Sequence, residues 1–241
     1  MSEPLLQLSG VHTHIGPYHI LQGVDLTVPK GGVSVLLGRN GAGKSTTLRT
    51  IMGLWTASSG SITFQGRDIT RMETPAISRS GIAFVPENMG IFTDLTVAEN
   101  MTLAATKGPI DPKRLAWIQE LFPPVRTFWN SSAGTLSGGQ KQMLAVSRAI
   151  VESRVLILID EPTKGLAPAI INAMTDALKE LKETDTTILL VEQNFAMASS
   201  IGDTVAVMDD GRIIHDGDMA EMVADKELQE RLMGLSLEAH Q

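Results

Sequence analysis

Nine consecutive residues near the start of the sequence combine glycines, a lysine and two hydroxyl side chains in an order that suits phosphate binding. They are Gly38, Arg39, Asn40, Gly41, Ala42, Gly43, Lys44, Ser45 and Thr46. They fit the pattern G-x-x-x-x-G-K-[ST], in which glycines let the backbone curl so that successive N–H groups point at phosphate oxygens. Lys44 would reach the β- and γ-phosphates, and the hydroxyl of Ser45 would ligate Mg²⁺. The run therefore predicts a site for the phosphates of a nucleotide.

The alternative interpretation of this run is a glycine-rich turn that fits the pattern by coincidence. The flanking sequence favours phosphate binding, because the apolar run Val33–Leu37 precedes the loop and helical spacing begins at Lys44. The pattern requires a strand, a loop and a helix in that order. The positive end of the helix would add to the attraction for an anion.

Two adjacent carboxylates, Asp160 and Glu161, follow the wholly apolar run Leu156–Ile159. A buried strand that ends in two acids brings them to the carboxyl edge of its sheet, where ligands bind in α/β folds. We expect Asp160 to bind Mg²⁺ and Glu161 to act as the base, or the orienting group, for an attacking water. The alternative, two solvated acids at a strand end, weakens once the phosphate loop is considered beside them.

A further glycine-containing segment, Leu136–Gln140, precedes a predicted helix and reads Leu-Ser-Gly-Gly-Gln. Ser137 can cap that helix, and the two glycines expose backbone N–H groups to an anion. A helix cap with no further role is the simpler interpretation, and the spacing by itself favours it.

The composition excludes several classes of protein. The chain has 241 residues, of which 43% are hydrophobic, and it has no cysteine. It therefore has no disulfide scaffold, thiolate metal site or cysteine nucleophile. The net charge of −7 argues against a nucleic-acid partner, which requires a basic face. The amino end lacks a secretory signal pattern, and the apolar runs are far shorter than the roughly 20 residues that span a bilayer. His12, His14, His19 and His215 have no metal-ligand spacing, and we interpret them as structural.

Apolar runs and stretches of helical spacing alternate along the chain, which predicts an α/β fold with a mainly parallel sheet covered on both faces. The expected strands are Leu5–Val11, Gln22–Val28, Val33–Leu37, Ser61–Phe64, Ile82–Val85, Val155–Ile159, Thr187–Val191, Thr204–Met208 and Arg212–His215. The expected helices are Lys44–Met52, Thr96–Ala105, Pro112–Phe122, Gln140–Ile150 and Ile170–Lys182.

The same patterns suggest how the chain is organised. We expect one domain over residues 1–241, with a helical subdomain at about 89–153 and a closing helix at about 219–234. The Pro- and Ser-rich stretch Pro123–Thr135 is interpreted as a connecting loop. Asp209-Asp210-Gly211 between two apolar runs predicts a β-hairpin.

The three motifs, Gly38–Thr46, Leu136–Gln140 and Leu156–Glu161, occur in the order found in ATP-binding-cassette (ABC) ATPases. Of these, Leu136–Gln140 resembles the signature sequence of that family, and the resemblance extends from Leu5 to about Gly217. It implies a P-loop NTPase (RecA-like) core with a mainly parallel sheet, an N-terminal antiparallel β part and a helical subdomain. Five short stretches resemble the nucleotide-binding subunit of branched-chain amino-acid importers: Val85–Asn88, Ile91–Phe92, Ala133–Thr135, Gly165–Pro168 and Val191–Asn194.

The resemblance implies ATP and Mg²⁺ as ligands, and ATP hydrolysis as the activity. Two ATPase subunits, identical or different, would face each other head to tail, so that Ser137, Gly138, Gly139 and Gln140 contact the ATP of the partner subunit. The further partners implied are two transmembrane permease subunits and, indirectly, a periplasmic solute-binding protein. The chain would act as a peripheral protein on the cytoplasmic face of the inner membrane. The apolar stretch Met89–Phe92 would border the permease groove, although ordinary packing explains it equally well.

Four positions depart from the usual pattern of the family. Glu87 replaces a Gln, and its carboxylate would join Ser45 and Asp160 as a metal ligand. Gln193 replaces a His, and it would assist Glu161 by donating a hydrogen bond to the γ-phosphate. Ala167 replaces an Asp. Adenine usually stacks on an aromatic side chain, but the aligned residue is Ile15, with Tyr18 as a substitute.

Other functions fit the same motifs. The chain could serve an importer of another solute, such as urea or an amide, or an exporter. It could also be an ABC ATPase of DNA repair or translation, or a nucleotide-gated binding module with little hydrolysis. Repair ATPases contain a long coiled-coil insertion and translation ATPases contain two cassettes, and a sequence of 241 residues leaves no room for either.

Overall fold

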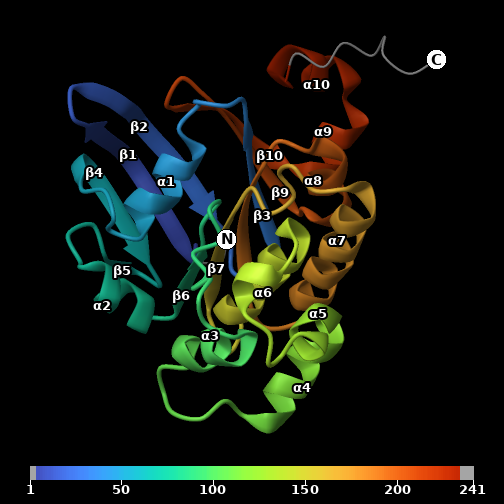
Figure 1. Ribbon diagram of the computed structural model, residues 1–241. Coiled ribbons are helices and arrows are strands. Elements are labelled where there is room, and N and C mark those ends of the chain that lie inside the picture. The colour runs from blue at the N-terminus through green and yellow to red at the C-terminus, as the bar shows by residue number, and fades with distance from the viewer. Residues whose placement is uncertain (1–3, 234–241) are drawn as a thin grey trace.

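Two β-sheets, with helices packed around them, make up residues 4–233, the part of the chain that the computed structural model describes (Figure 1). The smaller sheet has the order β2-β1-β4-β5 and is antiparallel throughout. Its strands are β1 (Leu6–Ile15), β2 (Tyr18–Val28), β4 (Ala57–Phe64) and β5 (Arg67–Asp68). The predicted N-terminal antiparallel part is confirmed, although β1 and β2 continue toward their shared turn well beyond the predicted ends.

The larger sheet has the order β10-β9-β3-β8-β7-β6. Its strands are β3 (Val33–Gly38), β6 (Ile82–Val85), β7 (Leu156–Asp160), β8 (Thr187–Glu192), β9 (Thr204–Asp209) and β10 (Arg212–Asp218). All neighbours pair in parallel except β9 and β10, which form the predicted hairpin. The mainly parallel sheet is therefore confirmed. The carboxyl ends of β3, β6, β7 and β8 lie along one edge, where the predicted phosphate loop and carboxylates meet.

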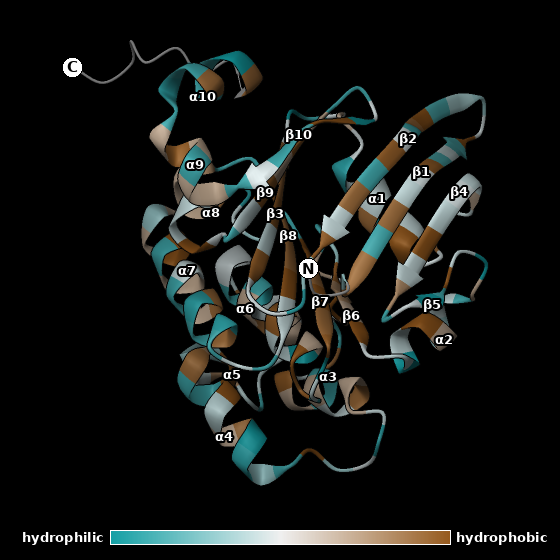
Figure 2. Cartoon of the chain, turned by 180° about the vertical axis from the view of Figure 1, so that it is seen from behind, coloured by the Kyte–Doolittle hydropathy of each residue, from teal (hydrophilic) through white to brown (hydrophobic). Residues whose placement is uncertain are grey.

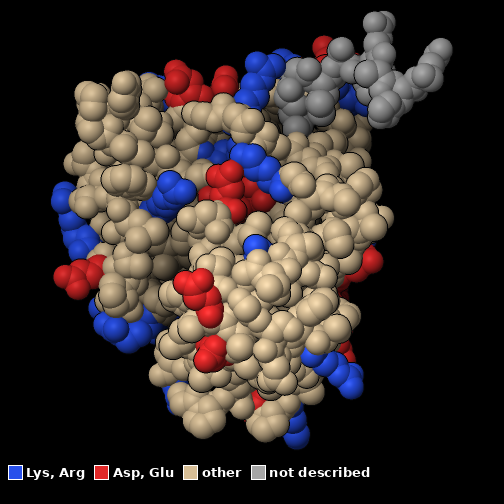
Figure 3. All heavy atoms as spheres, in the orientation of Figure 1, with Lys and Arg blue, Asp and Glu red and all other residues tan. Residues whose placement is uncertain are grey.

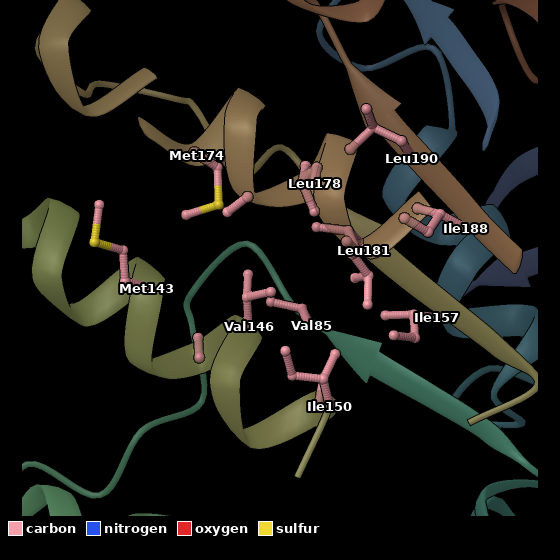
Figure 4. Packing of buried hydrophobic residues seen from close by; sticks show 14 of the residues in the cluster. Val85, Met143, Val146, Ile150, Ile157, Met174, Leu178, Leu181, Ile188 and Leu190 are labelled. Atoms are coloured by element: carbon pink, nitrogen blue, oxygen red, sulfur yellow. The ribbon is translucent and has the colours of Figure 1, made fainter. Parts of the chain in front are cut away.

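Both faces of the larger sheet are buried along β3, β7 and β8, so these strands read as continuous apolar runs. In β7, Ile157 and Ile159 belong to one hydrophobic core, whereas Leu156 and Leu158 belong to the other. The first core lies between this sheet and helices α6 (Gly138–Ala149) and α7 (Pro168–Lys182) (Figure 4). Figure 2 shows β7 and β8 largely apolar, whereas apolar and hydrophilic residues alternate along α7, whose buried side includes Met174, Leu178 and Leu181. This packing fixes the carboxyl edge of the sheet.

The remaining helices frame this edge or extend the fold. They are α1 (Lys44–Ile51), α2 (Thr74–Arg79), α3 (Val97–Ala104), α4 (Pro112–Leu121), α5 (Pro123–Thr127), the short 3₁₀ helix η1 (Ala133–Thr135), α8 (Phe195–Ile201), α9 (Met219–Ala224) and α10 (Lys226–Met233). The sequence did not predict α2 or α8. Between residues 4 and 233, the structure has no helix whose length and apolar character would allow it to cross a bilayer.

Two predictions about helices were wrong. The stretch Pro123–Thr135 is not a simple connecting loop, because it contains α5 and η1; α5 begins with two prolines, which are tolerated in the first turn of a helix. The closing helix is interrupted at Asp225, whose extended backbone ends α9 and whose Oδ1 accepts the N–H of Leu228 at 2.9 Å to begin α10. The predicted end at 234 lies outside the described residues.

Candidate functional site

The loop between β3 and α1 has a backbone that specific glycines make possible. A Cβ at Gly38 would lie 2.3 Å from the carbonyl oxygen of Met208, and Gly43 has φ +108°. Lys44 is buried, and its Nζ donates to the carbonyl oxygens of Gly38 at 2.8 Å and Arg39 at 3.1 Å. The loop thus curls around the lysine ammonium group at the amino end of α1.

Asp160 ends β7 directly beside this loop. Its side chain is fully buried, and Oδ1 accepts a hydrogen bond from the Ser45 hydroxyl at 2.9 Å. Among the described residues, Oδ2 has no hydrogen-bond partner although it is also buried. Burial raises the pKa of Asp160; the hydrogen bond from Ser45 opposes this rise, and the charges of Glu161 and Glu87 add to it. A buried oxygen without a partner beside a hydroxyl group is suited to a divalent cation.

Glu161 follows Asp160 and has a left-handed backbone conformation, with φ +46°. For a residue with a Cβ, this conformation costs about 1–2 kcal/mol. Its Oε1 lies 3.2 Å from Lys44 Nζ and accepts a hydrogen bond of 2.6 Å from Gln193 Nε2. Burial raises the pKa of Glu161, but the hydrogen bonds from Gln193 and Lys164 and the charge of Lys44 outweigh this and lower it. The carboxylate is therefore held ionised, as a general base requires.

Gln193 lies between the buried Glu192 and the helix-capping Asn194. The side chain of Glu192, at the end of β8, accepts the backbone N–H of Gln193 at 3.0 Å. Asn194 caps α8 by accepting the N–H of Met197 at 3.1 Å. The Gln193 amide group donates to both Glu161 Oε1 and Asn40 Oδ1, each at 2.6 Å. Gln193 thereby joins the phosphate loop to the carboxylate.

Glu87 follows β6 and forms an ion pair of 2.7 Å with Lys164, a residue that the sequence interpretation did not single out. Lys164 Nζ also lies 3.2 Å from Glu161 Oε2, and these two carboxylates raise the pKa of Lys164. The spacing of three positions between Glu161 and Lys164 is a sequence signal for their contact, but not for the ion pair of Lys164 with Glu87.

The phosphate loop, Glu87, Glu161 and Lys164 line one cleft of about 280 Å³. A neighbouring cleft of about 220 Å³ continues past Glu161 and Lys164 to Gln193. On the face seen in Figure 3, acidic and basic side chains lie side by side near the middle, and most of the surrounding surface is uncharged. The structure thus brings the predicted phosphate, metal and catalytic residues together at one edge of the sheet.

Residues Ser137–Gln140 lie elsewhere and line neither cleft. Ser137 caps α6 in a reciprocal arrangement: its Oγ accepts the Gln140 N–H at 3.4 Å, and its own N–H donates to Gln140 Oε1 at 2.9 Å. A Cβ at Gly139 would lie 2.6 Å from Ile170 Cγ2, whereas a Cβ at Gly138 would meet nothing within 4 Å. Packing against Ile170 therefore requires glycine at position 139. No neighbouring atom within this chain requires glycine at position 138.

Ile15 and Tyr18 pair across the turn between β1 and β2, and Tyr18 is 69% exposed. Neither lines the phosphate cleft, but Ile20 of β2 does. The sequence interpretation missed Ile20, because its proximity to the loop depends on how the two sheets pack.

Residues 21–164 match the family model described as ABC transporter. The chain is 36% identical over 232 residues to the high-affinity branched-chain amino acid transport ATP-binding protein BraG of Pseudomonas aeruginosa, covering 95% of this chain and all of BraG. It is also 36% identical over 220 residues to the probable branched-chain amino acid transport ATP-binding protein LivF of Archaeoglobus fulgidus, covering 90% and 93% of the two chains. These matches confirm the predicted resemblance and the predicted ABC-type ATP hydrolase.

The structure is similar to that of a nucleotide-free ATP-binding cassette from an ABC transporter, with a TM-score of 0.82 and 25% identity over 97% of this chain and all of the other. The predicted fold class is therefore confirmed. The order of the motifs, the carboxyl edge at which they meet and these similarities agree: the chain belongs to the ABC transporter family.

Proposed function

We propose that this chain is the ATP-binding and ATP-hydrolysing subunit of an importer that takes up branched-chain or related amino acids through partner permeases. The substrate class is supported by the similarity to BraG and LivF. One observation supports the proposed catalytic site most directly: Lys44, Asp160 and Glu161 lie beside the same loop. Ser45 is hydrogen-bonded to Asp160, and Glu161 lies within ion-pair distance of Lys44.

The phosphates of ATP would lie against the loop Gly38–Thr46. In the structure, Lys44 donates to two carbonyl oxygens of this loop. Charged phosphate oxygens are stronger acceptors than neutral carbonyl groups. We therefore expect Lys44 to turn toward the β- and γ-phosphates, with the N–H groups at the start of α1 adding further hydrogen bonds.

Ser45, Asp160 and Glu87 would hold Mg²⁺. The buried Asp160 Oδ2 without a partner supports this assignment, because a buried carboxylate oxygen requires a hydrogen-bond donor or a cation. When bound, Mg²⁺ would neutralise negative charge on the phosphate oxygens.

Glu161 would accept a proton from the attacking water while the water oxygen forms a bond to the γ-phosphorus. The bond from that phosphorus to the oxygen shared with the β-phosphate breaks, giving ADP and inorganic phosphate. Gln193 would hold Glu161 in place. Both hydrogens of its Nε2 are already engaged, so a hydrogen bond to the γ-phosphate would replace the one to Asn40.

A second ATPase subunit, either another copy or a related chain, would complete each site. Residues Ser137, Gly138, Gly139 and Gln140 would contact the ATP of that subunit. The open space beside Gly138 and the absence of this segment from the lining of the chain's own cleft support the arrangement.

Two transmembrane permease subunits and, through them, a periplasmic solute-binding protein would complete the transporter. The chain would be a peripheral protein on the cytoplasmic face of the inner membrane. Phe92, which is 49% exposed and lies under the guanidinium group of Arg148, supports a permease contact near Met89–Phe92. With a net charge of −7, no nucleic-acid partner is expected.

The nucleotide site is tested by measuring ATP affinity for Lys44→Ala, with Lys179→Ala, a half-exposed lysine on α7, as the control. Loss of the buried ammonium group should weaken ATP binding by about 100-fold or more. Unchanged affinity would contradict the site.

The transport role is tested by identifying the proteins that copurify from native membranes and by measuring uptake in vesicles. Permeases and uptake of leucine are expected. Uptake of urea but not of leucine would mean that urea, and not an amino acid, is the substrate. Purification without any permease would favour an ATPase that has no role in transport.

A further inference from the structure

The proposed phosphate cleft contains an unusual balance of charges. Two carboxylates, those of Glu87 and Glu161, line the cleft where a polyanion is expected, and the buried carboxylate of Asp160 lies behind Ser45. Among the described residues, Lys44 and Lys164 are the ammonium groups within ion-pair distance of Glu87 or Glu161. Lys44 belongs to the phosphate loop, which leaves the role of Lys164 to be explained.

Lys164 joins two loops that follow neighbouring strands. Its Nζ lies 2.7 Å from Glu87 Oε1, in the loop after β6, and 3.2 Å from Glu161 Oε2, directly after β7. The residues Glu87 and Lys164 are 77 positions apart in the sequence. The Lys164 side chain is 50% exposed, so removing it leaves no cavity in the core.

The two carboxylates that Lys164 contacts differ in how many other groups hold them. Glu161 is also held by Lys44 at 3.2 Å and by Gln193 at 2.6 Å. For Glu87, Lys164 is the sole cation within ion-pair distance in the described part of the chain. Loss of Lys164 therefore leaves Glu161 in place but leaves Glu87 as an uncompensated negative charge in the cleft.

We infer that Lys164 is a positioning residue that neutralises Glu87 and so allows the phosphates of ATP to bind beside this carboxylate. The inference rests on the proposed phosphate site. Unit charges attract or repel over several ångströms inside a partly buried cleft, where the effective dielectric constant is well below that of water. The pair formed by Glu87 and Lys164 would therefore carry a net charge close to zero at the position where ATP binds.

The test is the affinity for ATP alone, measured by calorimetry in EDTA, so that a role of Glu87 in holding Mg²⁺ does not enter. The variants are Lys164→Met, Glu87→Gln and the double variant, with Lys164→Arg as the conservative replacement. Lys179→Met is the matched control, because Lys179 is equally exposed and its nearest carboxylate oxygen, from Asp176, lies 4.0 Å away. Circular dichroism and thermal melting report whether each variant is folded, and Lys164→Gln serves if Lys164→Met is not.

Lys164→Met should weaken ATP binding by about tenfold, while Lys164→Arg and Lys179→Met stay close to the parent protein. The double variant should bind ATP within about twofold of Glu87→Gln, because removing the carboxylate removes the need for its counter-charge. The inference would be overturned if Lys164→Met weakened ATP binding equally in the parent protein and in Glu87→Gln. Unchanged ATP affinity in Lys164→Met would also overturn it.

The two proposals fail in different ways. If Lys44→Ala leaves ATP affinity unchanged, the phosphate site itself is wrong. If Lys44→Ala abolishes binding and Lys164→Met does not weaken it, the site stands and the role of Lys164 is wrong.

Discussion

The hydroxyl oxygen of Ser45 lies 2.9 Å from Oδ1 of Asp160, although 115 positions separate these residues in the sequence. The contact joins the start of α1 to the end of β7 and leaves the other carboxylate oxygen of Asp160 buried without a partner. The fold therefore maintains a polar group at a cost in stability. Such costs are common at functional sites.

Replacing Asp160 by Asn should raise the melting temperature while abolishing ATP hydrolysis that depends on Mg²⁺. Burial raises the pKa of Asp160 in the folded protein. The folded state therefore binds more protons than the unfolded state between pH 3.8 and the raised value, and stability falls as pH rises through this window. At neutral pH the ionised group destabilises the fold. We expect a gain of about 2 °C or more at pH 7.5 and a smaller gain near pH 3.8, where the folded protein binds the proton.

Thermal melting without nucleotide at both pH values checks this prediction, and a Mg²⁺ titration of ATPase activity checks the role of the carboxylate. A lower melting temperature at pH 7.5 would mean that Asp160 has a partner that stabilises its charge.

Replacing Glu161 by Gln should preserve ATP binding and slow hydrolysis by about 100-fold or more, the usual contribution of a general base. The amide group keeps an oxygen that can accept from Gln193, so the loop should keep its shape. ATP should then hold two subunits together, which size-exclusion chromatography with MgATP would detect. Glu183→Gln, at the exposed end of α7, is the control. Hydrolysis at the parent rate would remove Glu161 from the role of base.

The parts of the fold that the sequence predicted are those that local pattern determines. The apolar run Leu156–Ile159 predicted a strand buried on both faces, and Asp209-Asp210-Gly211 predicted a hairpin through its turn chemistry. The break at Asp225 was missed because the helical pattern continues across it, while the extended backbone of this one residue ends α9 and its side chain caps α10. The short helices in 123–135 were missed because proline suggests a loop, although it also suits the first turn of a helix.

The placement of the candidate site residues was predictable to the same extent. Lys44, Ser45, Asp160 and Glu161 belong to short motifs whose chemistry follows from residue type and spacing. The ion pair of Lys164 with Glu87 and the position of Ile20 in the cleft depend on which strands become neighbours. No local pattern contains that information, so these residues became visible only in the folded chain.

Gly138 and Gly139 provide a matched pair of substitutions to alanine in the first turn of α6. Gly139→Ala should destabilise the protein by about 1–3 kcal/mol, because its Cβ would lie 2.6 Å from Ile170. Gly138→Ala should leave the melting temperature unchanged or slightly higher, since its Cβ meets open space and alanine favours the helix. Yet Gly138→Ala should reduce ATPase activity by about tenfold if the partner's ATP approaches this backbone.

Thermal melting and steady-state hydrolysis of the two variants, each measured at several protein concentrations, separate these effects. Full ATPase activity in folded Gly138→Ala would contradict the proposed contact with the partner subunit's ATP.

Three histidines at the turn between β1 and β2 should make stability depend on pH. His19 Nε2 lies 2.9 Å from His12 Nδ1, and its ring stacks on His14 with centroids 4.2 Å apart. Desolvation, together with these two neighbours, lowers the pKa of His19 below 6.5. The unfolded chain therefore takes up the proton first as pH falls, so stability is complete above pH 6.5 and decreases from there down to the pKa of the folded state.

The melting temperature should therefore be lower at pH 5.5 than at pH 7.5, and His19→Gln should reduce that difference. His215→Gln, in β10, is the control and should keep the pH dependence of the parent protein. An identical dependence in His19→Gln would mean that the three rings separate in solution, so that protonating one of them costs the folded state nothing.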